Sequence, residues 1–266
     1  MMNIDLSGRT AVVTGGTAGI GLATVRLFLE AGANVAFCGR DEAKTKNVAD
    51  SLMSEYPDAA LLTRSCNVLD KAQVEELAGA VKETFGGTDM LVLNAGQARL
   101  SKFADTSDDD WREELELKYF SILNPAHVFM PQLEKSDAAS IVCTSSLLSR
   151  QPEPHLVATS SARAGQLALV HGMAHELAEK RVRVNSILIG QVASTQWRRR
   201  FEALEDKSIT WDEYTKGIAE RAGVPLGRIG KPEEAAQAIF FLATPMSSFT
   251  TGSTVDVSGG LSRHVG

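Results

Sequence analysis

A glycine-rich turn near the start of the chain has the spacing that suits phosphate binding. The apolar run Ala11 to Val13 leads into TGGTAGIG, residues 14–21, and an amphipathic segment follows. Gly15, Gly19 and Gly21 let the backbone turn sharply and bring its N–H groups close to a pyrophosphate. The helix that follows adds unpaired N–H groups and the positive end of its dipole. The turn therefore predicts a nucleotide-binding site that needs no basic side chain.

The rest of the chain repeats this order of strand and helix. Further strands are expected at 34–38, 59–65, 90–93, 140–144, 182–188 and 253–257, and helices at 41–56, 71–85, 106–133, 158–180 and 233–243. Repeated β-α units predict an α/β fold, a doubly wound parallel sheet with helices on both faces and ligands at the carboxyl ends of the strands. Residues 1–266 are expected to form one domain, with the irregular segment at about 191–228 as a lid over the site.

Composition excludes several other classes of protein. The net charge of -6 argues against a general nucleic-acid surface, which needs a basic face. No apolar run approaches the length of a membrane span, so no membrane contact and a cytoplasmic location are expected. Cys38, Cys66 and Cys143 are spaced too irregularly for a metal site and are predicted to be buried free thiols.

Motifs along nearly the whole chain resemble the short-chain dehydrogenase/reductase family. They are TGGTAGIG at 14–21, DMLVLNAG at 89–96, IVCTSS at 141–146, RVNSI at 183–187, GKPEE at 230–234 and TGSTVDVSGG at 251–260. The resemblance implies a single Rossmann-type domain, a nicotinamide cofactor, a small-molecule substrate and assembly as a homodimer or homotetramer.

The resemblance also assigns cofactor-binding residues. Those of the pyrophosphate turn are Gly15, Thr17, Gly19, Ile20 and Gly21. Asn94 and Gly96 match the segment beside the adenosine ribose. Asn67 stands where the family usually has an aspartate near adenine, and its amide can make similar hydrogen bonds.

Arg40 favours NADP over NAD. An acidic residue at the end of the second strand would accept a hydrogen bond from the 2′-hydroxyl of NAD and repel a 2′-phosphate. This chain has Gly39 and Arg40 there instead. A guanidinium suits the 2′-phosphate of NADP, whereas a plain solvated loop charge is the alternative interpretation.

The catalytic positions depart from the family pattern. Ser146 matches the serine that binds the carbonyl oxygen. Thr159 stands at the tyrosine position, Arg163 at the lysine position four residues later, and Lys118 at the asparagine position on the central helix. Arg163 remains able to hold the hydroxyls of the nicotinamide ribose. The Thr159 hydroxyl is a far weaker acid than a phenol.

Two other residues could move the proton. Lys118, partly desolvated near Arg163, could have a lowered pKa, or it could simply pair with Glu114 one turn earlier. His155, in the loop before Thr159, titrates in a suitable range, although most loop histidines are bystanders. Tyr119 is expected to pack in the core.

The leading hypothesis is an NADP-dependent oxidoreductase that acts on a small carbonyl or alcohol with an atypical catalytic set. A non-catalytic dinucleotide-binding or regulatory protein on the same fold is the main alternative, and a lyase that keeps the cofactor structurally is a third. Arg99 and Arg198 to Arg200 would favour an anionic substrate if they face the cleft.

Overall fold

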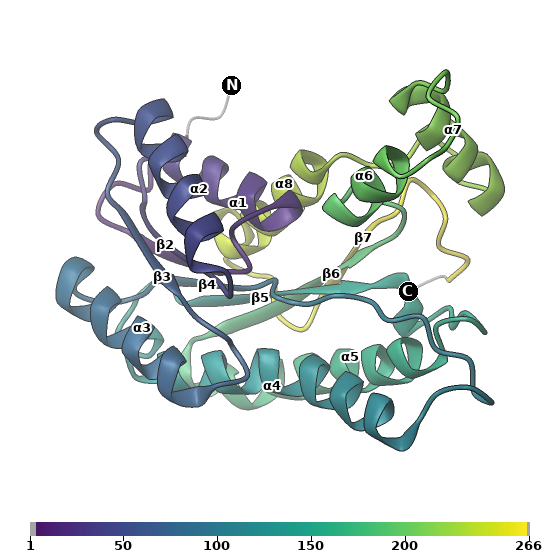
Figure 1. The fold of residues 1–266 in the computed structure, drawn as a ribbon. Helices are drawn as coiled ribbons and strands as arrows, with labels where there is room; N and C mark the ends of the chain where they lie inside the picture. The colour runs from purple at the N-terminus through teal and green to yellow at the C-terminus, as the bar shows by residue number, and fades with distance from the viewer. Residues whose placement is uncertain (1–3, 265–266) are drawn as a thin grey trace.

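The computed structural model describes residues 4–264 and shows a parallel sheet between two helical layers (Figure 1). The sheet has seven strands in the order β3-β2-β1-β4-β5-β6-β7, and all of its pairings are parallel. The strands are β1 (Thr10–Thr14), β2 (Asn34–Gly39), β3 (Leu61–Ser65), β4 (Met90–Leu93), β5 (Ser140–Ser146), β6 (Arg183–Ile189) and β7 (Thr254–Val257). The order reverses between β1 and β4, which is where an open α/β sheet binds its ligand.

Helices cover both faces of this sheet, as the β-α alternation predicts (Figure 1). The helices are α1 (Gly19–Glu30), α2 (Glu42–Glu55), α3 (Lys71–Phe85), α4 (Asp108–Leu133), α5 (Val157–Leu177), α6 (Thr195–Glu202), α7 (Trp211–Ala222) and α8 (Pro232–Ala243). Helices α1, α2 and α8 lie on one face, and α3, α4 and α5 lie on the other. Helix α4 continues through Pro125 and Pro131. None of the helices among residues 4–264 is long and apolar enough to cross a membrane.

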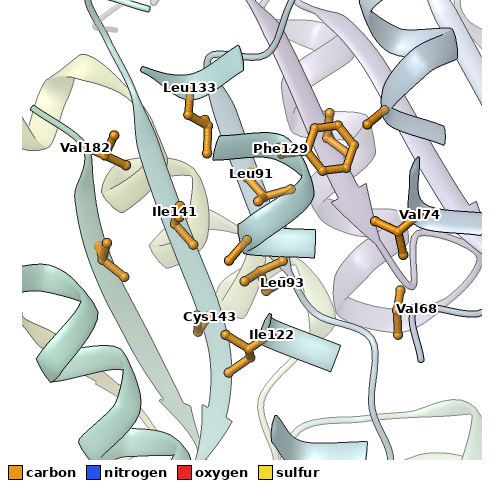
Figure 2. Packing of buried hydrophobic residues seen from close by; sticks show 14 of the residues in the cluster. Val68, Val74, Leu91, Leu93, Ile122, Phe129, Leu133, Ile141, Cys143 and Val182 are labelled. Atoms are coloured by element: carbon orange, nitrogen blue, oxygen red, sulfur yellow. The ribbon is translucent and has the colours of Figure 1, made fainter. Parts of the chain in front are cut away.

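The core consists of a buried apolar cluster on each face of the sheet. Figure 2 shows one of them, in which Phe129 and Leu133 of α4 pack near Leu91 and Ile141 of the central strands. These four side chains are fully buried, so they hold α4 at a fixed position across the sheet. Cys38, Cys66 and Cys143 are buried and free, which confirms their prediction as thiols.

Arg183, at the start of β6, closes the C-terminal end of α8. Its guanidinium donates to the carbonyl oxygens of Leu242, Ala243 and Thr244 at 2.8 to 3.1 Å, and to both oxygens of Ser247. The last carbonyls of a helix have no partners within the helix. Arg183 therefore supplies several of the missing donors for α8, and the hydroxyls of Ser140 and Ser247 supply others.

The segment at 191–228 forms a lobe of its own, containing α6 and α7 and no strand. Its apolar cluster consists of Ile218, Ala219 and Val224 together with Ile229, which directly follows the segment, and is separate from the two main clusters. Gly230 joins both ends of the lobe, because its N–H donates to Gln191 O at 2.8 Å and its oxygen accepts from Ala193 N at 2.9 Å. The break in the β-α alternation is confirmed, and movement of this lobe as a lid stays a prediction.

Candidate functional site

The glycine turn joins β1 to α1 at the reversal point of the sheet. Gly15 and Gly19 have φ angles of 67° and 53°, in the left-handed region that residues other than glycine rarely adopt. A Cβ on Gly21 would lie 2.2 Å from Gly15 O, so the helix approaches the turn too closely for any side chain there. A Cβ on Gly19 would meet no atom within 4 Å, so Gly19 is required there by its positive φ angle and not by crowding.

The N-terminus of α1 differs from those of α2, α3 and α4. Asp41, Asp70 and Ser107 cap α2, α3 and α4 by accepting hydrogen bonds from their first N–H groups. Ala18 at the start of α1 provides no such side-chain bond, and the first turn of α1 has no acidic residue. The first N–H groups of α1 therefore remain open to an anion, as a pyrophosphate would require.

Asn94 supports the turn from the end of β4. Its side-chain amide donates to Thr14 O at 3.3 Å and Gly15 O at 3.2 Å, and its backbone N–H donates to Thr14 Oγ1 at 3.0 Å. A Cβ on Gly96 would lie 3.8 Å from an Arg163 nitrogen. Asn94 thus holds the turn in place, and Gly96 brings the same segment next to Arg163.

The remaining cofactor candidates lie around the ends of β1, β2 and β3. Arg40 is exposed directly after β2, and its carbonyl accepts a hydrogen bond from Ser65 Oγ at 3.2 Å. Asn67 Oδ1 accepts from Leu69 N at 3.2 Å. Thr17 covers Gly39, where a Cβ would lie 2.5 Å from Thr17 Cγ2.

Ile20 is half-buried and packs against the core cluster under α1. Its side chain is therefore directed toward the core, and its contribution to a cofactor site would come from its place in the first turn of the helix.

Glu114 and Lys118 form a buried ion pair on α4. Lys118 Nζ lies 2.7 Å from Glu114 Oε1, and their side chains are 1% and 2% exposed. Thr159, on α5, donates to the same Glu114 oxygen at 2.5 Å, and Lys118 also donates to Gln97 O at 2.7 Å. The positions that replace the family's tyrosine and asparagine are thus joined through one carboxylate.

Burial sets the charge balance of this cluster. Burial, followed by the positive charge of Arg163, lowers the pKa of Lys118, and Glu114 opposes both, so that the pKa is about 8. Burial also lowers the pKa of the Arg163 guanidinium to about 10. Arg163 therefore stays charged at neutral pH, while Lys118 can exchange a proton in the range where enzymes operate.

Arg163 is held between α5 and β5. One nitrogen donates to Thr144 O at 2.8 Å and to Gln166 Oε1 at 2.9 Å, and Ser145 Oγ donates to the same Gln166 oxygen at 3.1 Å. The buried Arg163 Nε has no hydrogen-bond partner among residues 4–264. Such an orphaned donor, on a guanidinium whose Nη2 lies next to Gly96, fits a site that holds a polar group such as a ribose hydroxyl.

Ser146 and His155 make other contacts. Ser146, at the end of β5, accepts a hydrogen bond from Leu148 N at 3.3 Å through its side-chain oxygen. His155 is exposed, and its Nδ1 lies 3.9 Å from Glu153 Oε2. The structure thus brings Lys118 and Thr159 together through Glu114, places Arg163 close by, and leaves His155 on the outside.

Arg99 and the lobe arginines have other partners. Arg99 makes ion pairs with Asp110 and Glu113 at the start of α4. Arg198 stacks on Trp211 at 3.8 Å from the ring centroid, and Arg200 lies 5.0 Å from the centroid of another ring, that of Trp197. The two carboxylates that neutralise Arg99 weaken its predicted attraction for an anionic substrate.

Two parts of the site were not predicted from the sequence. Glu114 was expected only as a possible partner of Lys118, and its contact with Thr159 spans 45 positions of the chain. Gln166 joins Arg163 to Ser145 and donates to Lys118 O at 3.2 Å. The spacing of Glu114 and Lys118 places both on one face of a helix, and that of Thr159, Arg163 and Gln166 does the same. Spacing does not show that these two helix faces contact each other.

Comparisons with known proteins define the class. Residues 15–262 match the family model described as enoyl-(acyl carrier protein) reductase. A 3alpha-hydroxysteroid dehydrogenase of Mediterraneibacter gnavus is 30% identical over 97% of this chain and 98% of its own. A 3-oxoacyl-(acyl-carrier-protein) reductase FabG of Chlamydia muridarum is 32% identical over 98% of this chain and 100% of its own. The chain belongs to the short-chain dehydrogenase/reductase family of oxidoreductases, as its motifs predict.

Solved structures agree with this class. A short chain oxidoreductase of Pseudomonas aeruginosa PAO1, described as containing an atypical catalytic center, is 56% identical and superimposes with a TM-score of 0.96 over 98% of this chain and all of its own. Its NADPH-bound form gives a TM-score of 0.95 over the same shares of the two chains. L-sorbose reductase of Gluconobacter frateurii, complexed with NADPH and L-sorbose, is 26% identical with a TM-score of 0.92, over 99% of this chain and all of its own.

Proposed function

We propose that this chain is an NADP(H)-dependent oxidoreductase that interconverts a small carbonyl compound and its alcohol with an atypical catalytic set. The observation that carries this proposal is the buried Lys118, whose pKa of about 8 places an acid-base group beside Arg163 at family catalytic positions. The NADP prediction is supported by Arg40 and by the NADPH-bound relatives from Pseudomonas aeruginosa and Gluconobacter frateurii.

Each part of the site has a separate task. The open N-terminus of α1 and the glycine turn hold the pyrophosphate, and Arg40 pairs with the 2′-phosphate. Arg163 holds the ribose hydroxyls through donors such as its unpartnered Nε. When bound, the nicotinamide supplies or accepts the hydride. Ser146 orients the substrate oxygen, and Lys118 exchanges the proton with it directly or through one water.

Thr159 and His155 remain competing candidates for the proton path. Thr159 is buried and hydrogen-bonded to Glu114, and His155 is exposed in the loop before α5. Comparing Lys118→Ala, Thr159→Ala and His155→Ala separates the three. We expect Lys118→Ala to lose turnover and His155→Ala to keep it, and the reverse result would transfer the proton step to His155.

A non-catalytic dinucleotide-binding protein is the second candidate, because no phenol occupies the tyrosine position. Incubation with NADPH and a panel of small ketones and aldehydes, followed by absorbance, distinguishes the two functions. Turnover supports the oxidoreductase. Absence of turnover, with NADPH still binding by fluorescence, would leave the non-catalytic function. The lid, the assembly as a homodimer or homotetramer, and the cytoplasmic location stay predictions.

A further inference from the structure

Glu114 is not one of the catalytic positions that the family motifs assign, yet it contacts both Lys118 and Thr159, which replace the family's asparagine and tyrosine. We propose that Glu114 is a positioning residue, which keeps Lys118 ionised and holds the Thr159 hydroxyl, so that Lys118 and not Thr159 exchanges the proton. This inference rests on the proposed oxidoreductase function.

The hydroxyl of Thr159 already donates its one proton and accepts one hydrogen bond within the protein. It carries one proton, which points to Glu114 Oε1 at 2.5 Å, and its oxygen accepts a bond from Arg99 N at 3.2 Å. The only other acceptor for the same proton among residues 4–264 is Arg99 O at 3.3 Å. The hydroxyl therefore fastens the segment after β4 to α5 and has no proton left for a substrate.

The ammonium of Lys118 is only partly committed. Two of its hydrogens go to Glu114 Oε1 and Gln97 O, both at 2.7 Å. An ammonium has three donors, and the third makes no hydrogen bond within the described part of the chain. Lys118 thus keeps one proton available in a fixed direction, because Glu114 and Gln97 hold the other two.

The charges around Lys118 come from three elements. Glu114 faces it from its own helix, Arg163 faces it from α5, and Arg99 faces it from the segment after β4. Both arginines disfavour the ionised amine, although Arg99 is itself paired with Asp110 and Glu113. Glu114 is the one carboxylate in direct contact with the ammonium among residues 4–264, so its removal leaves two positive charges and burial unopposed.

The proton that Lys118 gives to the substrate is replaced from water. In the reductive direction one N–H bond of Lys118 breaks, one O–H bond forms on the substrate oxygen, and the nitrogen keeps the electron pair. The carbonyl carbon takes a hydride from a reduced nicotinamide, and the neutral amine regains its proton from water. Glu114 gains and loses no proton, which is why its role is positioning.

The experiment follows the titration of Lys118 without a substrate. The full chain is prepared with lysine labelled with ¹³C at Cε, and NMR follows the signal that disappears in Lys118→Arg. A midpoint near 8 is expected for the wild type. In Glu114→Gln we expect the midpoint to fall by about 1 to 3 pH units, since an opposite charge in contact shifts a pKa by that amount.

Asp110→Asn is the matched control, because it removes a carboxylate from α4 that contacts Arg99 and not Lys118. Its midpoint should stay within about half a unit of the wild type, since an indirect charge acts more weakly. An unchanged midpoint in Glu114→Gln, or an equal fall in Asp110→Asn, would overturn the proposal.

A second variant covers loss of folding. If Glu114→Gln unfolds, Glu114→Asp replaces it, where the shorter side chain should lower the midpoint by at least about half a unit. No change in that variant would also refute the proposal. The titration needs no substrate, so it tests the role of Glu114 even if the carbonyl panel shows no turnover. Absence of turnover would refute only the proposed function.

Where turnover occurs, Glu114→Gln should lower kcat for reduction at pH values above its new midpoint and leave the KM for NADPH unchanged.

Discussion

The stability of the protein should respond to pH through Lys118, and Lys118→Met removes that response. Burial lowers the pKa of this group from 10.5 to about 8. A fall of about 2.5 units corresponds to about 3 kcal/mol of penalty on the ionised lysine. Between pH 8 and 10.5 the unfolded chain keeps a proton that the folded chain has released, so raising the pH through this range stabilises the folded state.

The stability advantage of the wild type over Lys118→Met should therefore grow with pH. From pH 7 to pH 9 the expected gain is at least about 1.4 kcal/mol, because that interval passes the folded pKa by about one unit. Urea unfolding at pH 7, 8 and 9 measures the difference. A constant difference would refute the lowered pKa, since a pKa at or above 10.5 leaves both states protonated throughout this range.

Four further substitutions test the cofactor site and the fold. Arg40→Ala should weaken NADPH binding by about tenfold or more while leaving NADH nearly unchanged, and equal losses in fluorescence titrations would remove the argument for NADP. Gly21→Ala should abolish NADPH binding, because the new Cβ would lie 2.2 Å from Gly15 O, whereas Gly79→Ala, with no atom within 4 Å, should stabilise α3 by about 0.5 to 1 kcal/mol. Arg183→Met should lower the free energy of unfolding by about 3 kcal/mol, since charged donors to buried carbonyls are lost, and an unchanged denaturation midpoint would contradict the role of Arg183 in closing α8.

Much of the fold was predictable because the central strands are short apolar runs and the main helices have a polar face. Helix α3 and strand β4 begin and end where the pattern predicts, at 71–85 and 90–93. The prediction for α5 extended to Lys180, but the helix ends at Leu177. Residues 178–180 tighten into a short 3₁₀ turn before Arg181, which has a φ angle of 59°. Helix ends are decided by such local geometry, which spacing does not reveal.

The site was predictable as a set of positions but not as a network. Lys118 and Arg163 could be placed from the motifs, and a lowered pKa for Lys118 was among the open alternatives. That Glu114 would accept from Thr159 depends on how α4 packs against α5, and the paired carboxylates of Arg99 depend on the path of the segment after β4. Glu and Lys side chains are most often exposed, so the sequence does not indicate that Glu114 and Lys118 are buried. Their burial results from the packing of the helices around them.

The lobe that contains α6 and α7 carries its own apolar cluster, against which Leu261 packs. It joins the rest of the chain through the backbone bonds of Gly230, the bond from Leu226 N to Gly259 O and the ion pair of Arg228 with Glu234. A unit built in this way can detach as one body while its helices stay formed. Amide hydrogens within the lobe should then exchange with deuterated solvent together, through a shared opening event, and sooner than those of β5 and β6. The lobe would behave as a separate cooperative unit, whose opening free energy is set by a few bonds at its base.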